Sequence, residues 1–535
     1  MRFAVGVVGA WTVLFSGACF LPSVLASVQE LEEIAEFRRE LNRDLPDGFF
    51  TPATTPTAPV PVHRLYAEWE PASRALISVP LGIVLTEPKA LSFVIEFLEA
   101  TVAHIPVGIL FDRDEELRLG RFIREIEKSE ILKNYAETRI DYVESRAQNF
   151  WIRDHGPQFG QLKNGNLLVI DPIYRQLEAI AVNERDASMG NLNHIHYAND
   201  LTPQYIGKYL RSFHEYETIP SRPPLQLHGG DFASDGRGNV FLTEDTVLEN
   251  GENWDRIETI FDQYLGAENV YVLSPPNGKT ARHLDVLLKA VSENTIFVSQ
   301  APALQPGASI YNRTMREQLK RTVANNLAYL KRNLPEKRIV QLPMPSPFVV
   351  KRDARLNRLR KEITQIVCRK AGVDYALATN PNHKLKGVEA ARSAVALEIL
   401  MDTGLNINFN NDEHLEKLSR KYLDLGVQEY LDTYVDDWIF YRSYANSLIV
   451  VNERSEALIL LPRFSPQEGE SQDEYDAMEN EVENRYSEVY PSAALKWVNC
   501  DAISALGGSL HCMSITVPVR KGLNKSKRVS NKPSS

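Results

Sequence analysis

Short apolar runs rich in β-branched residues alternate with amphipathic stretches along the first 300 residues of the chain. The apolar runs predict strands, and they lie at residues 75–81, 107–111, 166–172, 239–244 and 295–300. The amphipathic stretches carry apolar residues at helical spacing and predict helices at residues 90–104, 114–131 and 203–212. Because strands and helices alternate, the pattern favours an α/β fold.

Two turn segments predict antiparallel strand pairs. The Gly-rich residues 234–238 precede the run at 239–244 and are expected to join it to an earlier strand. A second pair is predicted at 446–452 and 456–462. The recurrence of strand, turn, strand and helix indicates a repeated α/β unit rather than a doubly wound sheet. Neither a G-x-G-x-x-G motif after a strand nor a P-loop motif is present, so nucleotide-binding folds lose their usual sequence support.

Three segments differ from this body, which is expected to span residues 65–520. Residues 27–64 predict a charged helix followed by an extended Pro/Thr-rich linker. Residues 350–432 are charged and amphipathic, and they predict a helical insertion within the body. The basic tail at 521–535 is expected to be disordered.

Length and charge narrow the class of protein only slightly. The chain has 535 residues, enough for one large elaborated domain or for two to four smaller ones. Its formal net charge is −10, with acidic and basic residues interspersed. This charge favours solubility, suits a cationic ligand and argues against nucleic acid as a partner.

The N-terminus has the features of a secretory signal peptide. Arg2 is followed by an apolar run to Cys19, and cleavage is expected near Ala26, which predicts a secreted or periplasmic protein. The run is too short and too interrupted for a stable membrane span. An imperfect lipobox before Phe20 leaves a lipid anchor on Cys19 open.

Removal of residues 1–26 would leave three cysteines, Cys368, Cys500 and Cys512. An odd number means that at least one thiol is unpaired, which excludes a fold held together by disulfides alone. We expect Cys368 to be a small core residue.

Four stretches carry residues capable of chemistry, although each has an ordinary structural explanation. In the first stretch, Asp154 precedes Gly156-Pro157, a pair expected to end a strand. In the second, Gly229-Gly230 allows a close backbone approach or a bend. His283 and Asp285 would share one face of an extended chain. Cys512 ends the Gly-rich stretch GGSLHC, and in an extended strand the neighbouring His511 would point away from it, so His511 is expected to be structural.

Together these stretches supply one cysteine, one histidine and two aspartates, and the chain lacks zinc-site spacings. A cysteine with a histidine forms a nucleophile and its acid–base partner. Two further carboxylates are suited to a planar cation, because a guanidinium offers five donors in a fixed fork.

In this order, the stretches resemble the guanidino-group-modifying (pentein) superfamily, specifically the family of agmatine deiminases and Porphyromonas-type peptidylarginine deiminases. The resemblance rests on AEWEP (67–71), FWIRDHGP (150–157), the segment 228–244, HLD (283–285), SYANSLIVVN (443–452) and GGSLHC (507–512). It covers residues 65–345 and 436–520. It implies an α/β propeller of five ββαβ units around a pseudo-fivefold axis, with the 350–432 insertion added.

The resemblance also implies roles for individual residues. Cys512 would attack the guanidinium carbon, and His283 would protonate the departing ammonia and then activate water. Asp154 and Asp285 would hold the guanidinium nitrogens. Further substrate-binding candidates are Trp151, Arg175, His228 and Asn446. The mechanism requires no metal and no cofactor.

Three features modify what the resemblance implies. His228 stands where agmatine deiminases and arginine deiminases carry a glutamate, Arg282 stands where the agmatine type has glycine, and Arg175 lies where the secreted enzymes meet the substrate's carboxylate. With the signal peptide, they favour the secreted peptidylarginine type, acting on a small guanidine or an arginine-containing peptide or protein. An amidinotransferase and a non-catalytic exported binding protein remain alternatives, and the particular guanidine and the oligomeric state stay open.

Overall fold

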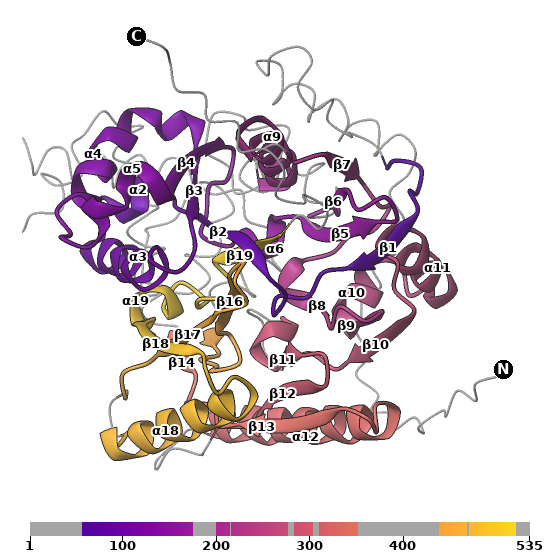
Figure 1. Ribbon diagram of the computed structural model, residues 1–535. Coiled ribbons are helices and arrows are strands. Elements are labelled where there is room, and N and C mark those ends of the chain that lie inside the picture. Colours follow the sequence, from indigo (N-terminus) through magenta and orange to yellow (C-terminus); the bar gives the residue numbers. More distant parts are fainter. Residues whose placement is uncertain are drawn as a thin grey trace, which may run out of the picture.

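The computed structural model describes residues 56–174, 199–214, 216–276, 283–302, 310–350, 438–467 and 470–519 (Figure 1). Several sequence predictions lie outside these residues: the signal peptide, the charged N-terminal helix, the 350–432 insertion beyond residue 350, the basic tail, Arg175, Arg282 and Cys368.

One sheet pattern recurs along the described chain. Strand β5 (Gln158–Leu162) pairs antiparallel with β6 (Leu167–Ile170), which pairs parallel with β7 (Thr218–Ser221) after helix α9 (Thr202–His214). The same antiparallel-then-parallel order occurs in three further sheets: β8 (Phe232–Ser234), β9 (Asn239–Thr243) and β10 (Asn269–Leu273); β11 (Leu288–Ser292), β12 (Thr295–Ser299) and β13 (Arg338–Leu342); β16 (Leu448–Val451), β17 (Ala457–Arg463) and β18 (Ala494–Asn499). These are α/β units with mixed sheets, and the repeat predicted from the sequence is confirmed.

A further sheet joins the two ends of the described chain. Strand β19 (Ser514–Pro518) pairs antiparallel with β2 (Ala72–Ser78), which continues in parallel to β3 (Val107–Asp112) and β4 (Ile140–Ser145). Strand β1 (Val62–Leu65) lies within the segment for which we expected a linker, and it pairs with β5. Strands β14 (Phe348–Val350) and β15 (Trp438–Phe440) pair antiparallel at the two ends of residues 351–437.

In each repeated unit, helices connect the two strands that pair in parallel, and others lie between units (Figure 1). Beside α9, they are α2 (Leu81–Val84), α3 (Pro88–Thr101), α4 (Glu116–Ile126), α5 (Ala136–Arg139), α6 (Ile152–His155), α10 (Glu244–Glu249), α11 (Trp254–Ile260), α12 (Ile310–Asn333), α18 (Gln472–Val489) and α19 (Asp501–Ser504). Shorter turns are η1 (Arg113–Glu115), η2 (Leu132–Asn134), η3 (Gly229–Asp231), η4 (Phe261–Leu265, a π-helix) and η5 (Leu284–Val286). The predicted strands and helices that fall within the described residues are therefore present. Within the described chain, every helix is too short or too polar to cross a bilayer.

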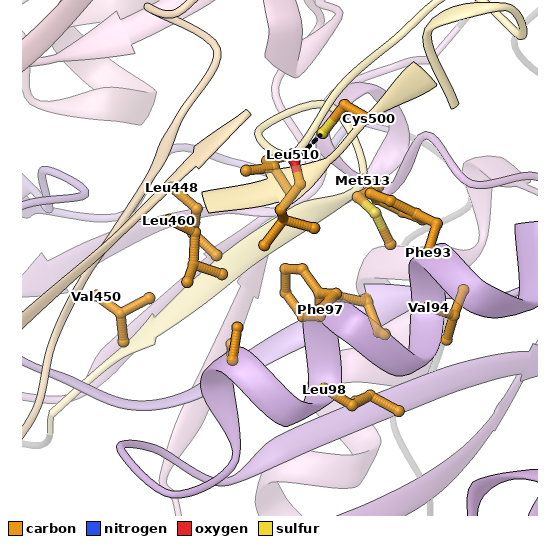
Figure 2. Packing of buried hydrophobic residues seen from close by; sticks show 14 of the residues in the cluster. Phe93, Val94, Phe97, Leu98, Leu448, Val450, Leu460, Cys500, Leu510 and Met513 are labelled. Atoms are coloured by element: carbon orange, nitrogen blue, oxygen red, sulfur yellow. Dashed lines mark hydrogen bonds between the residues drawn. The ribbon is translucent and has the colours of Figure 1, made fainter. Parts of the chain in front are cut away.

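Helix α3 shows why these elements pack as they do. Pro88 opens the helix at a position where a missing N–H costs nothing. The apolar stripe of the helix contacts β18 and α19, and it belongs to the same hydrophobic cluster as buried residues of β16 and β17. Figure 2 shows Phe93 and Phe97 of this helix facing Leu510 and Met513, which flank the predicted nucleophile. Both Leu510 and Met513 are fully buried. The loop that carries Cys512 is therefore anchored in the main hydrophobic core.

We expect Phe97→Ala to lower the thermal unfolding midpoint strongly, because Phe97 is completely buried and its loss leaves a cavity costing about 3–5 kcal/mol. Leu117→Ala is the matched control, since Leu117 is 99% exposed and its removal is expected to shift stability by at most about 0.5 kcal/mol. Equal midpoints for the two variants, measured by calorimetry, would contradict the packing around α3.

Candidate functional site

Asp154 is positioned by a single helical turn. It lies in α6, which ends where the Gly156 N–H donates to the Ile152 carbonyl at 2.7 Å. We predicted that Gly156-Pro157 would end a strand, and this was wrong: the pair ends α6, and strand β5 begins after it at Gln158. The turn places the Asp154 carboxylate in the interior.

His283 and Asp285 also lie on a turn rather than in an extended segment. His283 immediately precedes η5, so the extended-chain argument for their shared direction was wrong. The turn nevertheless brings both residues to the same place. His283 Nδ1 lies 3.4 Å from Asp154 Oδ1, and Asp285 Oδ2 lies 3.4 Å from Cys512 Sγ.

Cys512 lies in a turn just before β19 and is buried. Asn446, which precedes β16, holds this turn from the neighbouring unit. Its Nδ2 donates to Cys512 Sγ at 3.2 Å, and its Oδ1 accepts the backbone N–H of His511 at 3.0 Å. The structure therefore places Asn446 in direct contact with the predicted nucleophile.

Glycines permit the close approach of these segments. A Cβ on Gly230 would lie 2.6 Å from His283 Nδ1 and 2.7 Å from Asp154 Oδ1, and one on Gly508 would lie 2.2 Å from the ring of Trp151. Such distances are shorter than real Cβ contacts. Glycine at both positions is thus required for the site to assemble.

The electrostatics of the site favour a neutral thiol and a protonated imidazole. Burial opposes charge on His283, but the carboxylates of Asp154, Asp231, Asp285 and Glu249 outweigh it and raise its pKa to about 9. For Cys512, burial and the nearby carboxylates act in the same direction and raise the thiol pKa well above its usual value.

His228 lies beside the catalytic candidates. Its ring centroid is 5.7 Å from that of His283 and 5.0 Å from that of Tyr174. Donor atoms of His228, Asp231 and His283 all lie within 4.8 Å of one another, so within the described residues this group could hold a divalent cation. Burial, reinforced by Asp154 and Asp245, raises the pKa of Asp231 to about 6 despite the opposing charge of His283.

Sequence reasoning missed a set of charged residues that adjoins Asp285 and centres on Glu68. His511, which we expected to be structural and to point away, has its Nδ1 2.8 Å from Asp285 Oδ2 and its Nε2 2.8 Å from Glu68 Oε2. Lys289 and Arg153 also contact Glu68. Glu68 lies in the segment 67–71 that carried part of the family resemblance, and that position was the one available signal.

The structure therefore brings together Cys512, His283, Asp154 and Asp285, with Trp151, His228 and Asn446 around them. Arg175 lies outside the described residues. This is the arrangement of an α/β protein whose site combines a buried thiol, an imidazolium and two carboxylates.

Comparison with known proteins gives the family. Residues 64–518 match the family model for Porphyromonas-type peptidyl-arginine deiminase, and the chain belongs to this family. A Mycoplasma mycoides protein named as an agmatine deiminase is 24% identical over 173 residues, which are 31% of this chain and 44% of that protein. The chain thus aligns with less than half the length of this curated relative.

Solved structures of agmatine deiminases share the fold. The Campylobacter jejuni agmatine deiminase superimposes with a TM-score of 0.51 at 14% identity, covering 86% of this chain and 97% of that one. The Enterococcus faecalis agmatine deiminase gives 0.51 at 16% identity, covering 85% of this chain and 96% of that one.

The raised pKa of His283 predicts a pH-dependent contribution to stability. A group whose pKa is about 9 when folded and about 6.5 when unfolded stabilises the folded state fully below pH 6.5, and this contribution is lost as pH rises through about 9. The unfolding midpoint of the wild type should therefore exceed that of His283→Gln at pH 7, and the difference should narrow by pH 9.5. A constant difference across this range would show that His283 carries no such charge.

Proposed function

We propose that this protein hydrolyses a guanidino group to a ureido group with release of ammonia, through a covalent intermediate on Cys512. The observation that carries the proposal is the convergence of one buried thiol, one imidazolium and two buried carboxylates from separate segments of the chain. Family membership supports the same reaction class.

The two carboxylates are suited to a guanidinium. Asp154 Oδ1 and Asp285 Oδ1 are buried, and neither accepts a hydrogen bond among the described residues, although Asp154 Oδ1 lies 3.4 Å from His283 Nδ1. A buried carboxylate oxygen without a donor is costly, and a bound guanidinium would supply planar N–H donors and a positive charge to both. Asp285 also contacts Cys512 Sγ, so a cation held there would lie next to the nucleophile.

The protonation states fit a two-stage reaction. The substrate cation lowers the thiol pKa, the thiol loses its proton to solvent, and the thiolate forms a bond to the guanidinium carbon. The imidazolium of His283 donates a proton to one nitrogen, which leaves as ammonia, and an S-alkylthiouronium remains on Cys512. Neutral His283 then takes a proton from water as its oxygen bonds to the same carbon. The C–S bond breaks, a ureido product leaves, and ammonia takes up the remaining proton.

The proposed substrates are a small guanidine such as agmatine or an arginine-containing peptide or protein. We favour peptidyl-arginine because residues 1–26 have the features of a signal peptide and His228 replaces the glutamate of agmatine-type enzymes.

Fusion of residues 1–26 to a reporter tests the export proposal: the reporter should appear outside the cytoplasm, and its retention inside would contradict export.

We also infer that the repeated sheets are blades arranged around a common axis, as in the pentein fold. The recurrent antiparallel-then-parallel pairing supports this arrangement, as does the pairing of β19 with β2, which joins the last unit to the first. An experimental structure in which the sheets did not surround the Cys512 site would contradict it.

Replacement of the nucleophile provides the direct test of function. Purified wild type should release ammonia and ureido product from at least one of arginine, agmatine and peptides with internal or C-terminal arginine. Cys512→Ala should lose at least about 10³-fold of this activity, because the covalent step is removed. Cys500→Ala is the matched control, since Cys500 is completely buried among apolar side chains of the main hydrophobic core, and it should retain activity.

Two outcomes would overturn the proposal. Activity that survives Cys512→Ala would exclude the covalent route through this thiol. Absence of turnover on every guanidine, with folded protein, would favour a binding protein, and transfer of the amidino group to an added amine instead of water would indicate an amidinotransferase.

A further inference from the structure

A chain of charged side chains continues from Asp285 through His511 to Glu68. Its central member is His511, which bridges two carboxylates: Asp285 at 2.8 Å from Nδ1 and Glu68 at 2.8 Å from Nε2. Carboxylate oxygens of ionised groups only accept hydrogen bonds, so both contacts are hydrogen bonds only when both ring nitrogens carry hydrogen. A doubly protonated His511 would therefore tie Asp285 to Glu68.

Glu68 is itself held by several parts of the chain. Its Oε1 accepts from Lys289 Nζ at 2.6 Å and from the backbone N–H of Ile449 at 2.9 Å, and its Oε2 lies 3.0 Å from Arg153. Burial alone would raise the pKa of Glu68, but Lys289, His511 and Arg153 together hold it well below its usual value. Glu68 is therefore an ionised carboxylate in a fixed position, and it can hold His511 by accepting a hydrogen bond from Nε2.

The consequence for Asp285 is positional. His511 engages Oδ2, while Oδ1 is buried and has no hydrogen-bond partner among the described residues. One oxygen is thus anchored from behind, and the other is available to a ligand. Burial would raise the pKa of Asp285, but the hydrogen bond and charge of His511 lower it, so the carboxylate stays ionised.

Arg153, which contacts Glu68, also holds the backbone at His511 and Cys512. The backbone N–H of Arg153 donates to the Cys512 carbonyl at 3.0 Å, and Arg153 Nε donates to the His511 carbonyl at 3.3 Å. A cavity of about 60 Å³ is lined by Glu68, Asp285 and His511, among other residues, but not by Cys512, His283 or Asp154. His511 therefore contacts the same Asp285 oxygen, Oδ2, as Cys512 Sγ does, and leaves Oδ1 to a ligand.

We propose that His511, supported by Glu68, is a positioning residue that fixes Asp285 for guanidinium binding, and this inference rests on the deiminase function proposed above. The role requires a doubly protonated ring between two carboxylates. A glutamine carries both of its donor hydrogens on one nitrogen and has no charge, so it cannot reproduce the contacts that the two ring nitrogens make with Asp285 and Glu68. Asp285 therefore loses its anchor.

Binding to an inactive background separates this inference from the function on which it rests. Titration calorimetry should detect binding of the guanidine substrate to the Cys512→Ala variant. If no substrate has been identified, arginine amide is used as the ligand. Asp154→Asn in that background should abolish binding. If Cys512→Ala binds no guanidine at all, the proposed function fails. If it binds, the effect of His511 can be measured directly.

Adding His511→Gln to Cys512→Ala should weaken binding about ten- to hundredfold, the loss expected for a charge-assisted hydrogen bond that orients the ligand's partner. Glu68→Gln should weaken it less, and His511→Gln should cost less in the Glu68→Gln background than alone, because the two residues act as one unit. In the active enzyme, His511→Gln should raise KM by more than it lowers kcat.

His104→Gln is the control for loss of a histidine, because the hydrogen bonds of His104 Nε2 within the described part of the chain are with the backbone carbonyls of Val450 and Glu456. It should leave guanidine binding within about twofold. Unchanged binding in His511→Gln would overturn the inference. An equal loss of binding affinity from His511→Gln in the Glu68 and Glu68→Gln backgrounds would also overturn it. Unfolding midpoints confirm that each variant is folded.

Discussion

Buried negative charge is the constraint on which this site depends. Asp154, Asp231 and Asp285 are buried together, and Glu68 lies close behind them. An isolated carboxylate in the interior is strongly unfavourable, so each must be protonated or paired with a cation. Where fixed cations face the carboxylate, its pKa falls, as for Glu68; where burial dominates, it rises, as for Asp231.

This charge balance divides the site into two layers. In the rear layer, Lys289, Arg153 and His511 surround Glu68, and His511 also contacts one oxygen of Asp285. In the front layer, His283 is the cation next to Asp154, and it is shared among several carboxylates. The front layer therefore has more carboxyl groups than cationic side chains, and a cationic ligand would favour their ionised forms.

The sequence predicted much of the framework and the members of the front layer, but not their local conformation. The apolar runs at 107–111 and 295–300 are buried strands because their composition suits no solvent-exposed element. Asp154 and His283 were found through motif order, yet both lie on short turns that we expected to be extended. A four-residue helix such as α6 has no intrinsic stability, so only tertiary contacts decide its geometry.

The rear layer could not have been predicted from spacing. Glu68 and His511 meet because β2 and β19 pair across nearly the whole described chain, and no local pattern encodes that contact. The prediction for His511 failed for a related reason, since it assumed an extended strand in which alternate residues point apart. The strand begins only at Ser514, and the preceding turn directs the imidazole towards Asp285.

Under the proposed function, the same balance explains how a thiol with a raised pKa can act as a nucleophile. The carboxylates that would hold the substrate are also those that keep Cys512 protonated in the empty site. A guanidinium cancels their field and lowers the thiol pKa, whereas a neutral urea does not. The nucleophile therefore forms only when the cationic substrate is bound. Loss of the positive charge on conversion to the ureido product removes the attraction that held the ligand, which favours its release.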